Sequence, residues 1–253
     1  MLSSGRVRGM SVDVPAIQTV QRAAAILGAF TPERPRLSLG EITAELGMSK
    51  ATAHRYARAL RAANLLRYDP VAARYTLGPQ ILALEAAARA GLPIVTAAEP
   101  YLDELMRETD LTAVLSVWNG DGPTVVRCAD NTVGDVRISV RTGSQLDLTR
   151  SAQGRIFCAY LPAAEAPGIA RRLKSSADLR KVVEEVRREG IAANSPEDFG
   201  VRVLAAPVFE RTNVVAAIAV VGTSVRLSGA EEVAAAATLR RIAARLSQEL
   251  GAE

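Results

Sequence analysis

The 253-residue sequence has few of the features that mark secreted and membrane proteins. Its two cysteines, Cys128 and Cys158, both lie in apolar stretches and provide no disulfide framework. The longest apolar candidate, residues 214–222, fits a buried strand and is much shorter than the roughly 20 residues of a membrane span. No apolar segment follows Arg6 and Arg8, so a signal peptide is not expected. We therefore expect a cytoplasmic protein with no membrane partner.

The sequence also lacks the groups that metal sites and enzymes need. His54 is its only histidine, and no Cys or Asp/Glu cluster lies near it, so no metal site is expected. A glycine-rich phosphate loop, a frame of paired carboxylates, and a Ser/His/Asp or Cys/His set in the C-terminal half are all missing. Cys158 is interpreted as a core residue of an apolar helix. We therefore expect a protein that is not an enzyme and uses no cofactor.

The composition is that of a folded chain with an uneven charge distribution. Hydrophobic residues make up 49% and charged residues 23%, and aromatics are only 4%, so Ala, Val and Leu must fill most of the interior. The length suggests two domains. Residues 1–90 hold 12 basic and 6 acidic side chains, whereas the remainder holds 19 basic and 21 acidic ones. Such asymmetry favours a polyanion partner for the N-terminal third.

The N-terminal third has the pattern of a helix-turn-helix. A helix is expected at 15–30, where apolar residues recur at spacings of three and four. Ser38 and Glu41 then match a capping box that opens a short helix, and Gly47 is a good residue to end it. After a two-residue break, Ser49 can cap a third helix that runs to about residue 63. This order of helix, short helix, tight turn and helix is typical of a helix-turn-helix.

The third helix has one apolar and one cationic face. Ala53, Tyr56, Ala57 and Leu60 share the face expected to pack inward. The opposite face presents Ala51, Arg55 and Arg58, with His54 at its edge and Lys50 and Thr52 in the first turn. Arg can read guanine, whereas Lys and Thr mostly hold phosphates. A solvated charged face is the alternative, but the preceding capped helix and the charge asymmetry favour DNA.

Two short strands, 65–68 and 74–77, are expected to form a hairpin that completes a winged helix. Arg67 and Arg74 lie on it and would touch the DNA backbone. The alanine-rich helix expected at 80–90 either pairs with a symmetry mate or packs on its own chain, and the sequence leaves both open.

The rest of the chain predicts an α+β domain. Helices are expected at 93–108, 151–161, 177–189 and 228–250, and strands at 112–118, 124–129, 133–140, 190–193, 201–209 and 214–221. Strand triplets bracketed by helices indicate a PAS- or GAF-like antiparallel sheet with covering helices, an architecture that commonly holds a small-molecule pocket. The expected layout is a disordered tail at 1–14, a winged helix-turn-helix at 15–78, a linker helix at 79–92 and an effector-binding and oligomerisation domain at 93–253. Translation from Met1 and from Met10 both stay open.

Five segments together resemble the IclR family of regulators. They are SLGEI at 38–42, KATAHR at 50–55, RYTLGP at 74–79, SAQGR at 151–155 and FGVRVLAAPVF at 199–209. The resemblance implies a transcription factor, usually a repressor and sometimes an activator, that binds palindromic operators as a homodimer or a dimer of dimers. It also implies a small organic effector in the C-terminal domain, often an aromatic acid or a central metabolite.

The resemblance and the helix faces together give two sets of candidate residues. The DNA-binding set is Ser49, Lys50, Ala51, Thr52, His54, Arg55, Arg58, Arg67 and Arg74. By position in the family, the effector-binding set is Ile138, Arg150, Ala152, Gln153, Gly154, Val201, Val203, Ala219 and Val221.

The chain departs from the family pattern at the effector site. It is apolar at Ala193, Val203, Ala219 and Val221, where serines, a cysteine or an aspartate are common, while Thr149-Arg150 replaces His-Ala and Arg155 replaces lysine. We expect a largely apolar pocket with Gln153 and Arg150 as polar anchors for a carboxylate-bearing effector, because polyhydroxy or dicarboxylate ligands would bury unpaired polar groups there. The alternatives are a collapsed, structural pocket and a metabolite-binding module without a DNA function.

Overall fold

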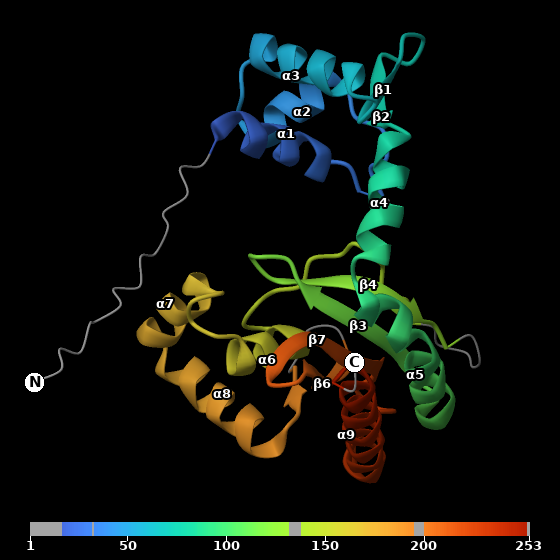
Figure 1. The fold of residues 1–253 in the computed structure, drawn as a ribbon, viewed down its shortest axis with the longest axis vertical. Coiled ribbons are helices and arrows are strands. Elements are labelled where there is room, and N and C mark those ends of the chain that lie inside the picture. The colour runs from blue at the N-terminus through green and yellow to red at the C-terminus, as the bar shows by residue number, and fades with distance from the viewer. Residues whose placement is uncertain (1–16, 32, 132–137, 195–199, 252–253) are drawn as a thin grey trace, which may run out of the picture. The chain divides into compact units, whose positions relative to one another are not determined.

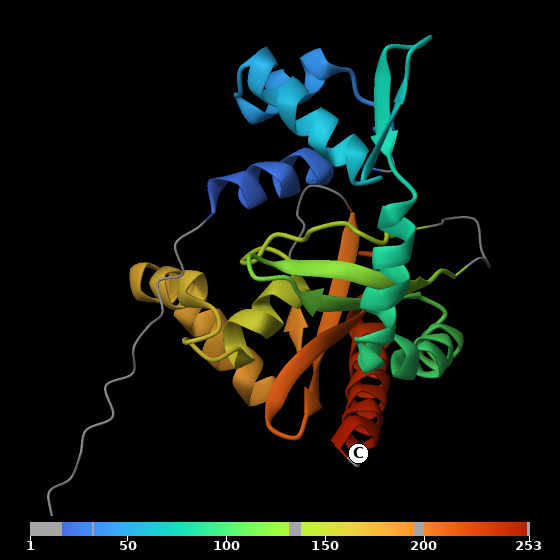
Figure 2. The same cartoon turned by 45° about the horizontal axis from the view of Figure 1, so that its top comes forward.

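The computed structural model describes residues 17–31, 33–131, 138–194 and 200–251. The chain divides into two compact units, one up to Ala90 and one from Gly91 (Figures 1 and 2). The expected tail at 1–14, with Met1 and Met10, lies outside the described residues, as does Phe199 at the start of the fifth family-like segment.

The described residues of the N-terminal unit form three helices, a hairpin and a fourth helix (Figure 1). Their bounds are α1 Gln18–Gly28, α2 Leu39–Leu46, α3 Lys50–Ala62, β1 Leu66–Asp69, β2 Arg74–Leu77 and α4 Gln80–Ala90. The two strands are antiparallel, with Leu66 opposite Leu77 and Asp69 opposite Arg74. The predicted winged helix-turn-helix is confirmed.

Local side-chain chemistry places the turn between α2 and α3. The Glu41 backbone N–H donates to Ser38 Oγ at 3.2 Å, and the Glu41 carboxylate accepts from the Ser38 N–H at 2.7 Å, so the predicted capping box is confirmed. Gly47 ends α2 with φ +60°, a left-handed conformation that glycine adopts without strain. Ser49 Oγ then accepts from the Thr52 N–H at 3.2 Å and starts α3.

The core of this unit fixes which face of α3 points outward. Ala53, Tyr56, Ala57 and Leu60 are buried, as their spacing predicts. They pack in one cluster with side chains from α1, α2 and the hairpin, among them Ile26, Ile42, Leu66 and Tyr75. The opposite face of α3 is therefore left free of the protein core.

In the described part of the C-terminal unit, a five-stranded antiparallel sheet lies between two layers of helices. Its elements are α5 Pro93–Thr109, β3 Thr112–Trp118, β4 Pro123–Ala129, α6 Ala152–Tyr160, α7 Pro167–Ser175, α8 Ala177–Glu189, β5 Ala192–Ala193, β6 Val201–Glu210, β7 Asn213–Thr223 and α9 Gly229–Gly251. The strand order is β4-β3-β7-β6-β5. One core lies between the sheet and α5 and α9, and the other between the sheet and α6, α7 and α8 (Figure 1). The predicted α+β class is confirmed.

Three elements differ from the sequence expectations. The strand expected at 133–140 is wrong for residues 138–140, which pair with no other strand. Residues 133–137 lie outside the described residues. Instead, the carbonyls of Ile138 and Val140 accept hydrogen bonds from the side chains of Thr112 and Cys128. The strand expected at 190–193 shrinks to β5. Helix α7 was not predicted; it is nine residues long, and Ile169 is its only buried residue.

Among the described residues no single helix is long and apolar enough to cross a membrane; α4 and α5 satisfy length and composition only as a pair that is bent by 77°.

Candidate nucleic-acid interface and ligand pocket

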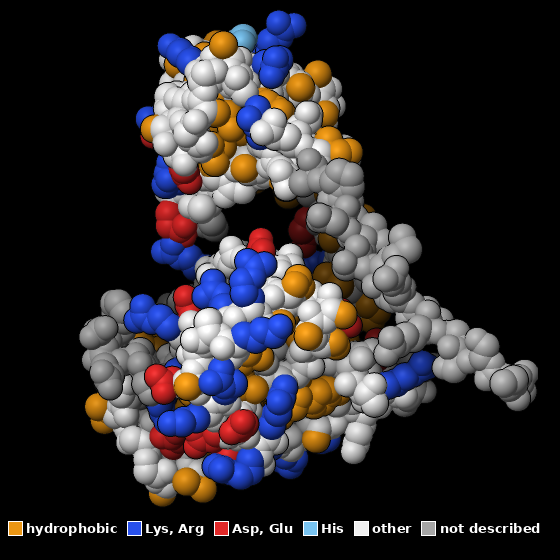
Figure 3. Space-filling view, turned by 90° about the vertical axis from the view of Figure 1, so that its left-hand side faces the viewer, with side chains coloured by type: hydrophobic (Ala, Val, Ile, Leu, Met, Phe, Trp, Pro, Cys, Tyr) orange, Lys and Arg blue, Asp and Glu red, His pale blue; other side chains and the backbone are white. Residues whose placement is uncertain are grey.

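The outer face of α3 gathers cations that point to solvent. Lys50, His54, Arg55 and Arg58 are exposed, as are the small residues Ser49 and Ala51, and Thr52 is half-buried. Figure 3 shows the pale blue histidine at the surface with Lys and Arg side chains near it. Within the described part of the chain, Lys50, Arg55 and Arg58 form no ion pair, although the Arg55 guanidinium lies 5.9 Å from the centre of the Tyr56 ring.

Four described carboxylates of the N-terminal unit, those of Glu41, Glu45, Asp69 and Glu85, have partners outside this face. Glu45 pairs with Arg34 at 2.9 Å, and Glu85 pairs with Arg89 at 2.5 Å. Asp69 accepts from two backbone N–H groups in the hairpin loop. Hydrogen bonds from Ser38, helped by Arg74, lower the pKa of Glu41 to about 2. The positive potential of α3 is therefore available to an anionic partner.

The two wing arginines differ in their surroundings. Arg67 on β1 is exposed and makes no ion pair with any described residue. Arg74 on β2 is half-buried, and its guanidinium donates to Glu41 Oε2 at 3.1 Å and to the Arg36 carbonyl at 3.2 Å. Arg67 is free to reach a phosphate, whereas Arg74 links the wing to the start of α2.

Most of the candidate effector residues lie on one face of the sheet and on the helix that covers it. Val203 on β6 is opposite Val221 on β7, and Ala219 on β7 is opposite Val114 on β3. Ala152, Ala219 and Val221 are buried in the core beneath α6, and Ile138, Val201 and Val203 pack partly buried against it. Arg150 is exposed.

The start of α6 is held tightly against the preceding segment. Ser151 Oγ accepts from the Gly154 N–H at 2.9 Å and caps the helix. A Cβ atom at position 154 would lie 2.2 Å from the Leu148 carbonyl oxygen, so only glycine fits there. The cap at Ser151 and the close packing at Gly154 therefore fix the position of the Gln153 backbone at the start of α6.

Gln153 is a polar residue at the buried start of α6. It is 4% exposed, and its amide forms no hydrogen bond with any residue that the structure describes. On the same side of the sheet, Ser116 Oγ is fully buried and also lacks a partner among the described residues. A buried polar group left unpaired costs about 1–3 kcal/mol, so such a group is a candidate for contact with a ligand.

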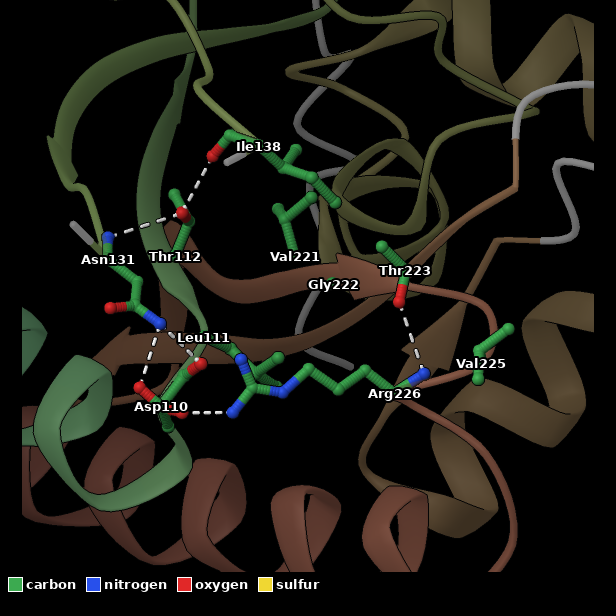
Figure 4. A pocket seen from close by; sticks show the side chains of 10 residues that line it. All are labelled: Asp110, Leu111, Thr112, Asn131, Ile138, Val221, Gly222, Thr223, Val225 and Arg226. Atoms are coloured by element: carbon green, nitrogen blue, oxygen red, sulfur yellow. Dashed lines mark hydrogen bonds and ion pairs between the residues drawn. The ribbon is translucent and has the colours of Figure 1, made fainter. Parts of the chain in front are cut away.

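A cavity of about 280 Å³ opens at one end of this face (Figure 4). Of the candidate effector residues only Ile138 and Val221 line it; the other seven do not. Its polar side contains an Asp110–Arg226 ion pair, with the Asn131 amide donating to Asp110 Oδ1 at 2.8 Å. The complete lining is Asp110, Leu111, Thr112, Asn131, Ile138, Val221, Gly222, Thr223, Val225 and Arg226.

Sequence reasoning did not find the polar side of this cavity. Asp110 follows α5 in a left-handed conformation, and Arg226 lies in the connection between β7 and α9. These two residues are 116 positions apart, and no local motif links them.

The two cysteines have raised pKa values. Burial raises the pKa of the Cys128 thiol to about 11 and that of Cys158 to about 12, which leaves both thiols protonated and poorly nucleophilic at neutral pH. No group of three or more His, Cys, Asp or Glu side chains that could hold a metal ion occurs within the described ranges.

A winged helix with an unneutralised cationic recognition face, joined to a helix-covered antiparallel sheet, defines a one-component transcriptional regulator. The model of the IclR helix-turn-helix domain matches residues 19–70, and the model of the bacterial transcriptional regulator IclR C-terminal domain matches residues 86–248. The chain belongs to the IclR family of DNA-binding transcriptional regulators, whose members are not enzymes and whose C-terminal domain binds effectors.

Relatives with this organisation cover almost the whole chain. The glycerol operon regulatory protein of Streptomyces griseus is 31% identical over 248 residues, which are 93% of this chain and 97% of the relative. The crystal structure of a putative IclR regulator from Silicibacter has a TM-score of 0.81 at 26% identity and covers 92% of this chain and 96% of its own. An IclR homolog from Microbacterium hydrocarbonoxydans, complexed with 4-hydroxybenzoate, has a TM-score of 0.74 at 17% identity over 93% of this chain and 100% of its own, a likeness of fold alone.

Proposed function

We propose that this regulator is a cytoplasmic repressor that binds a palindromic operator and is released by a small, largely apolar effector with a carboxylate group. The observation that carries the DNA part is the outward face of α3, where Lys50, Arg55 and Arg58 are exposed and have no ion-pair partner within the described ranges.

In this proposal the residues of α3 have two roles. Arg55 and Arg58 face the floor of the major groove, where a guanidinium can bond bidentately to guanine. Ser49, Lys50 and Thr52 hold phosphates, and His54 contacts the edge of the groove. The small side chain of Ala51 lets the helix approach the DNA closely. Arg67 on the wing adds a phosphate contact, and Arg74 holds the wing in place through its bond to Glu41.

The same proposal needs two copies of the chain, as a dimer or a dimer of dimers, because a palindrome presents two half-sites related by a two-fold axis. Support comes from α4, in which no residue is buried. Its leucines Leu82 and Leu84 are 72% and 51% exposed. Its two charged residues, Glu85 and Arg89, pair with each other. An apolar helix surface with internally balanced charge suits contact with a second copy of itself.

The effector class follows from the lining of the α6 side of the sheet. Ala219, Val203 and Val221 offer no hydrogen bonds, so hydroxyl-rich ligands would lose more in desolvation than they gain. Gln153 supplies an unpaired amide, and the N-terminal backbone of α6 favours a carboxylate. The cavity beside Ile138 and Val221 supplies room for part of a small ligand.

Release requires that the effector bind more tightly to the form of the protein that binds DNA weakly. A salt titration of the full-length protein with its upstream DNA tests the first half of the proposal. We expect a steep fall of affinity with salt for the operator and tighter binding to it than to unrelated duplex. A salt-insensitive protein with no operator preference would favour a metabolite-binding module without a DNA function.

Deletion of the gene tests the direction of regulation. We expect transcription from the bound promoter to rise in the deletion strain, because the repressor no longer occupies the operator. A fall in transcription would identify an activator of the same family.

A further inference from the structure

A hollow of about 410 Å³ lies between α1 and the first turn of α3. Gln21, Arg22 and Ala25 of α1 form one wall. The turn between α2 and α3 forms the other, from Leu46 to Ser49, together with Thr52. Among these residues, only Ser49 and Thr52 belong to the candidate DNA-binding set, and the sequence predicts Gly47 only as the end of α2.

Arg22 lies in the wall of this hollow, and no described residue supplies it with a counter-charge. It is half-buried and makes no ion pair or side-chain hydrogen bond with any residue that the structure describes. Helix α1 contains no acidic residue. The two carboxylates of α2 have other partners: Glu45 is paired with Arg34 at 2.9 Å, and Glu41 is held by Ser38 and Arg74.

The hollow is continuous with the cationic face of α3. Ser49 and Thr52 line it, and their hydroxyls bond to each other at 2.9 Å. Lys50, the next residue after Ser49, is exposed on the DNA-contacting side. A phosphate of the strand beside the major groove would therefore meet Arg22 when α3 enters the groove, since the hollow borders the turn from which α3 starts.

We propose that Arg22, with the Gln21 amide beside it, binds a backbone phosphate of the operator in this hollow. Helix α1 then holds one DNA strand while α3 contacts the bases. The phosphate contact of α1 thereby fixes how deep α3 lies in the major groove and in which direction it points. This inference rests on the proposed insertion of α3 into the major groove. The contact carries no base-sequence information, because phosphates are the same at every step of the duplex.

An Arg22→Ala variant of the full-length protein tests the proposal by fluorescence anisotropy with operator and with unrelated duplex DNA. We expect affinity to fall by the same factor for both duplexes. The slope of log K against log salt should decrease by about 0.9 for each lost phosphate contact per subunit. Arg22→Lys should keep most of the slope, because the charge remains.

Arg34→Ala is the matched control, because Arg34 lies in the same unit but is neutralised by Glu45. It should leave the slope unchanged, and circular dichroism should show that both variants melt like the wild type. Wild-type affinity and slope in Arg22→Ala would overturn the proposal, and so would a loss confined to the operator, which indicates base reading. Failure of the wild-type protein to bind DNA would instead overturn the proposed function. The wild-type measurement therefore separates failure of the Arg22 proposal from failure of the proposed function.

Discussion

Arg74 on the second wing strand and Glu41 in the first turn of α2 form an ion pair at 3.1 Å, although they are 33 positions apart in the chain. Glu41 simultaneously accepts from the Ser38 N–H, so one carboxylate caps α2 and anchors the wing. The helix-turn-helix and the hairpin are therefore held in a fixed relation by a contact that also uses the Arg36 carbonyl.

Replacing Arg74 by alanine should weaken DNA binding through a less ordered wing and not through a lost phosphate contact. We expect a modest drop in operator affinity with the wild-type salt slope. Arg67→Ala is the comparison: Arg67 is exposed and unpaired among the described residues, so its loss should lower the slope by about 0.9 per subunit. A lower slope in Arg74→Ala would contradict its positioning role. Salt titrations of both variants decide the matter.

Acid should destabilise the N-terminal unit through Glu41. The pKa of this carboxyl lies near 2 in the folded protein, below its ordinary value of 4.5, because Ser38 and Arg74 stabilise the charged form. A depressed pKa adds stability that is complete above pH 4.5 and is lost as the pH falls toward 2. Glu41→Gln should therefore flatten the loss of thermal stability between pH 5 and about 2. Glu45→Gln, on the same helix, is the control for removing a carboxylate, and an unchanged pH profile in Glu41→Gln would refute the assignment.

Arg55→Ala should cost about 1–3 kcal/mol of operator binding if Arg55 reads a base edge. The loss should be larger for the operator than for unrelated DNA, because a base contact discriminates between sequences. Competition binding with single-base operator variants measures this directly. Equal losses on both duplexes would show that Arg55 holds a phosphate instead.

Gln153→Leu should stabilise the ligand-free C-terminal unit while abolishing the effector response. The substitution removes an amide that forms no hydrogen bond with any described residue, and it puts an apolar side chain of similar size in its place, so we expect a small gain in the free energy of unfolding. Gln145→Leu, at an exposed position, is the control and should change neither property. Urea unfolding and effector-dependent release from DNA provide the two measurements. A destabilised variant would mean that the Gln153 amide has a structural partner.

Gly154→Ala should displace the start of α6 and weaken both folding and effector binding. The added methyl group would meet the Leu148 carbonyl oxygen at 2.2 Å, a contact that only a backbone shift can relieve. Gly168→Ala in α7 provides the control, since a methyl group added there would have no atom within 4 Å. Thermal melts should separate the two variants by several degrees, and equal melts would argue against tight packing at Gly154.

Features set by neighbours along the chain were predictable from the sequence. The capping box of Ser38 and Glu41, the end of α2 at Gly47 and the buried face of α3 all follow from spacings of three or four residues. Such features depend on hydrogen bonds and on helix geometry within a single turn. The resemblance at the family segments likewise needed only residue order.

Contacts between distant residues were not predictable in this way. The cavity depends on Asp110, Asn131 and Arg226, which three different connections bring together. The segment containing Ile138 alternates like a strand but is bound through the Thr112 side chain. An alternation of apolar and polar residues indicates which side chains face a core. It does not indicate whether a partner strand supplies the backbone hydrogen bonds.

The sequence by itself therefore determined that a cationic helix follows a capped turn, and that two domains of winged-helix and antiparallel-sheet type succeed each other. Only the tertiary structure decided which charges stay unpaired: Arg74 is tied to Glu41, whereas Arg22, Arg55 and Arg58 have no carboxylate partner among the described residues. The reason is physical. Helix periodicity acts within a turn, whereas the charge left free for DNA depends on which distant carboxylates the fold brings within hydrogen-bonding distance.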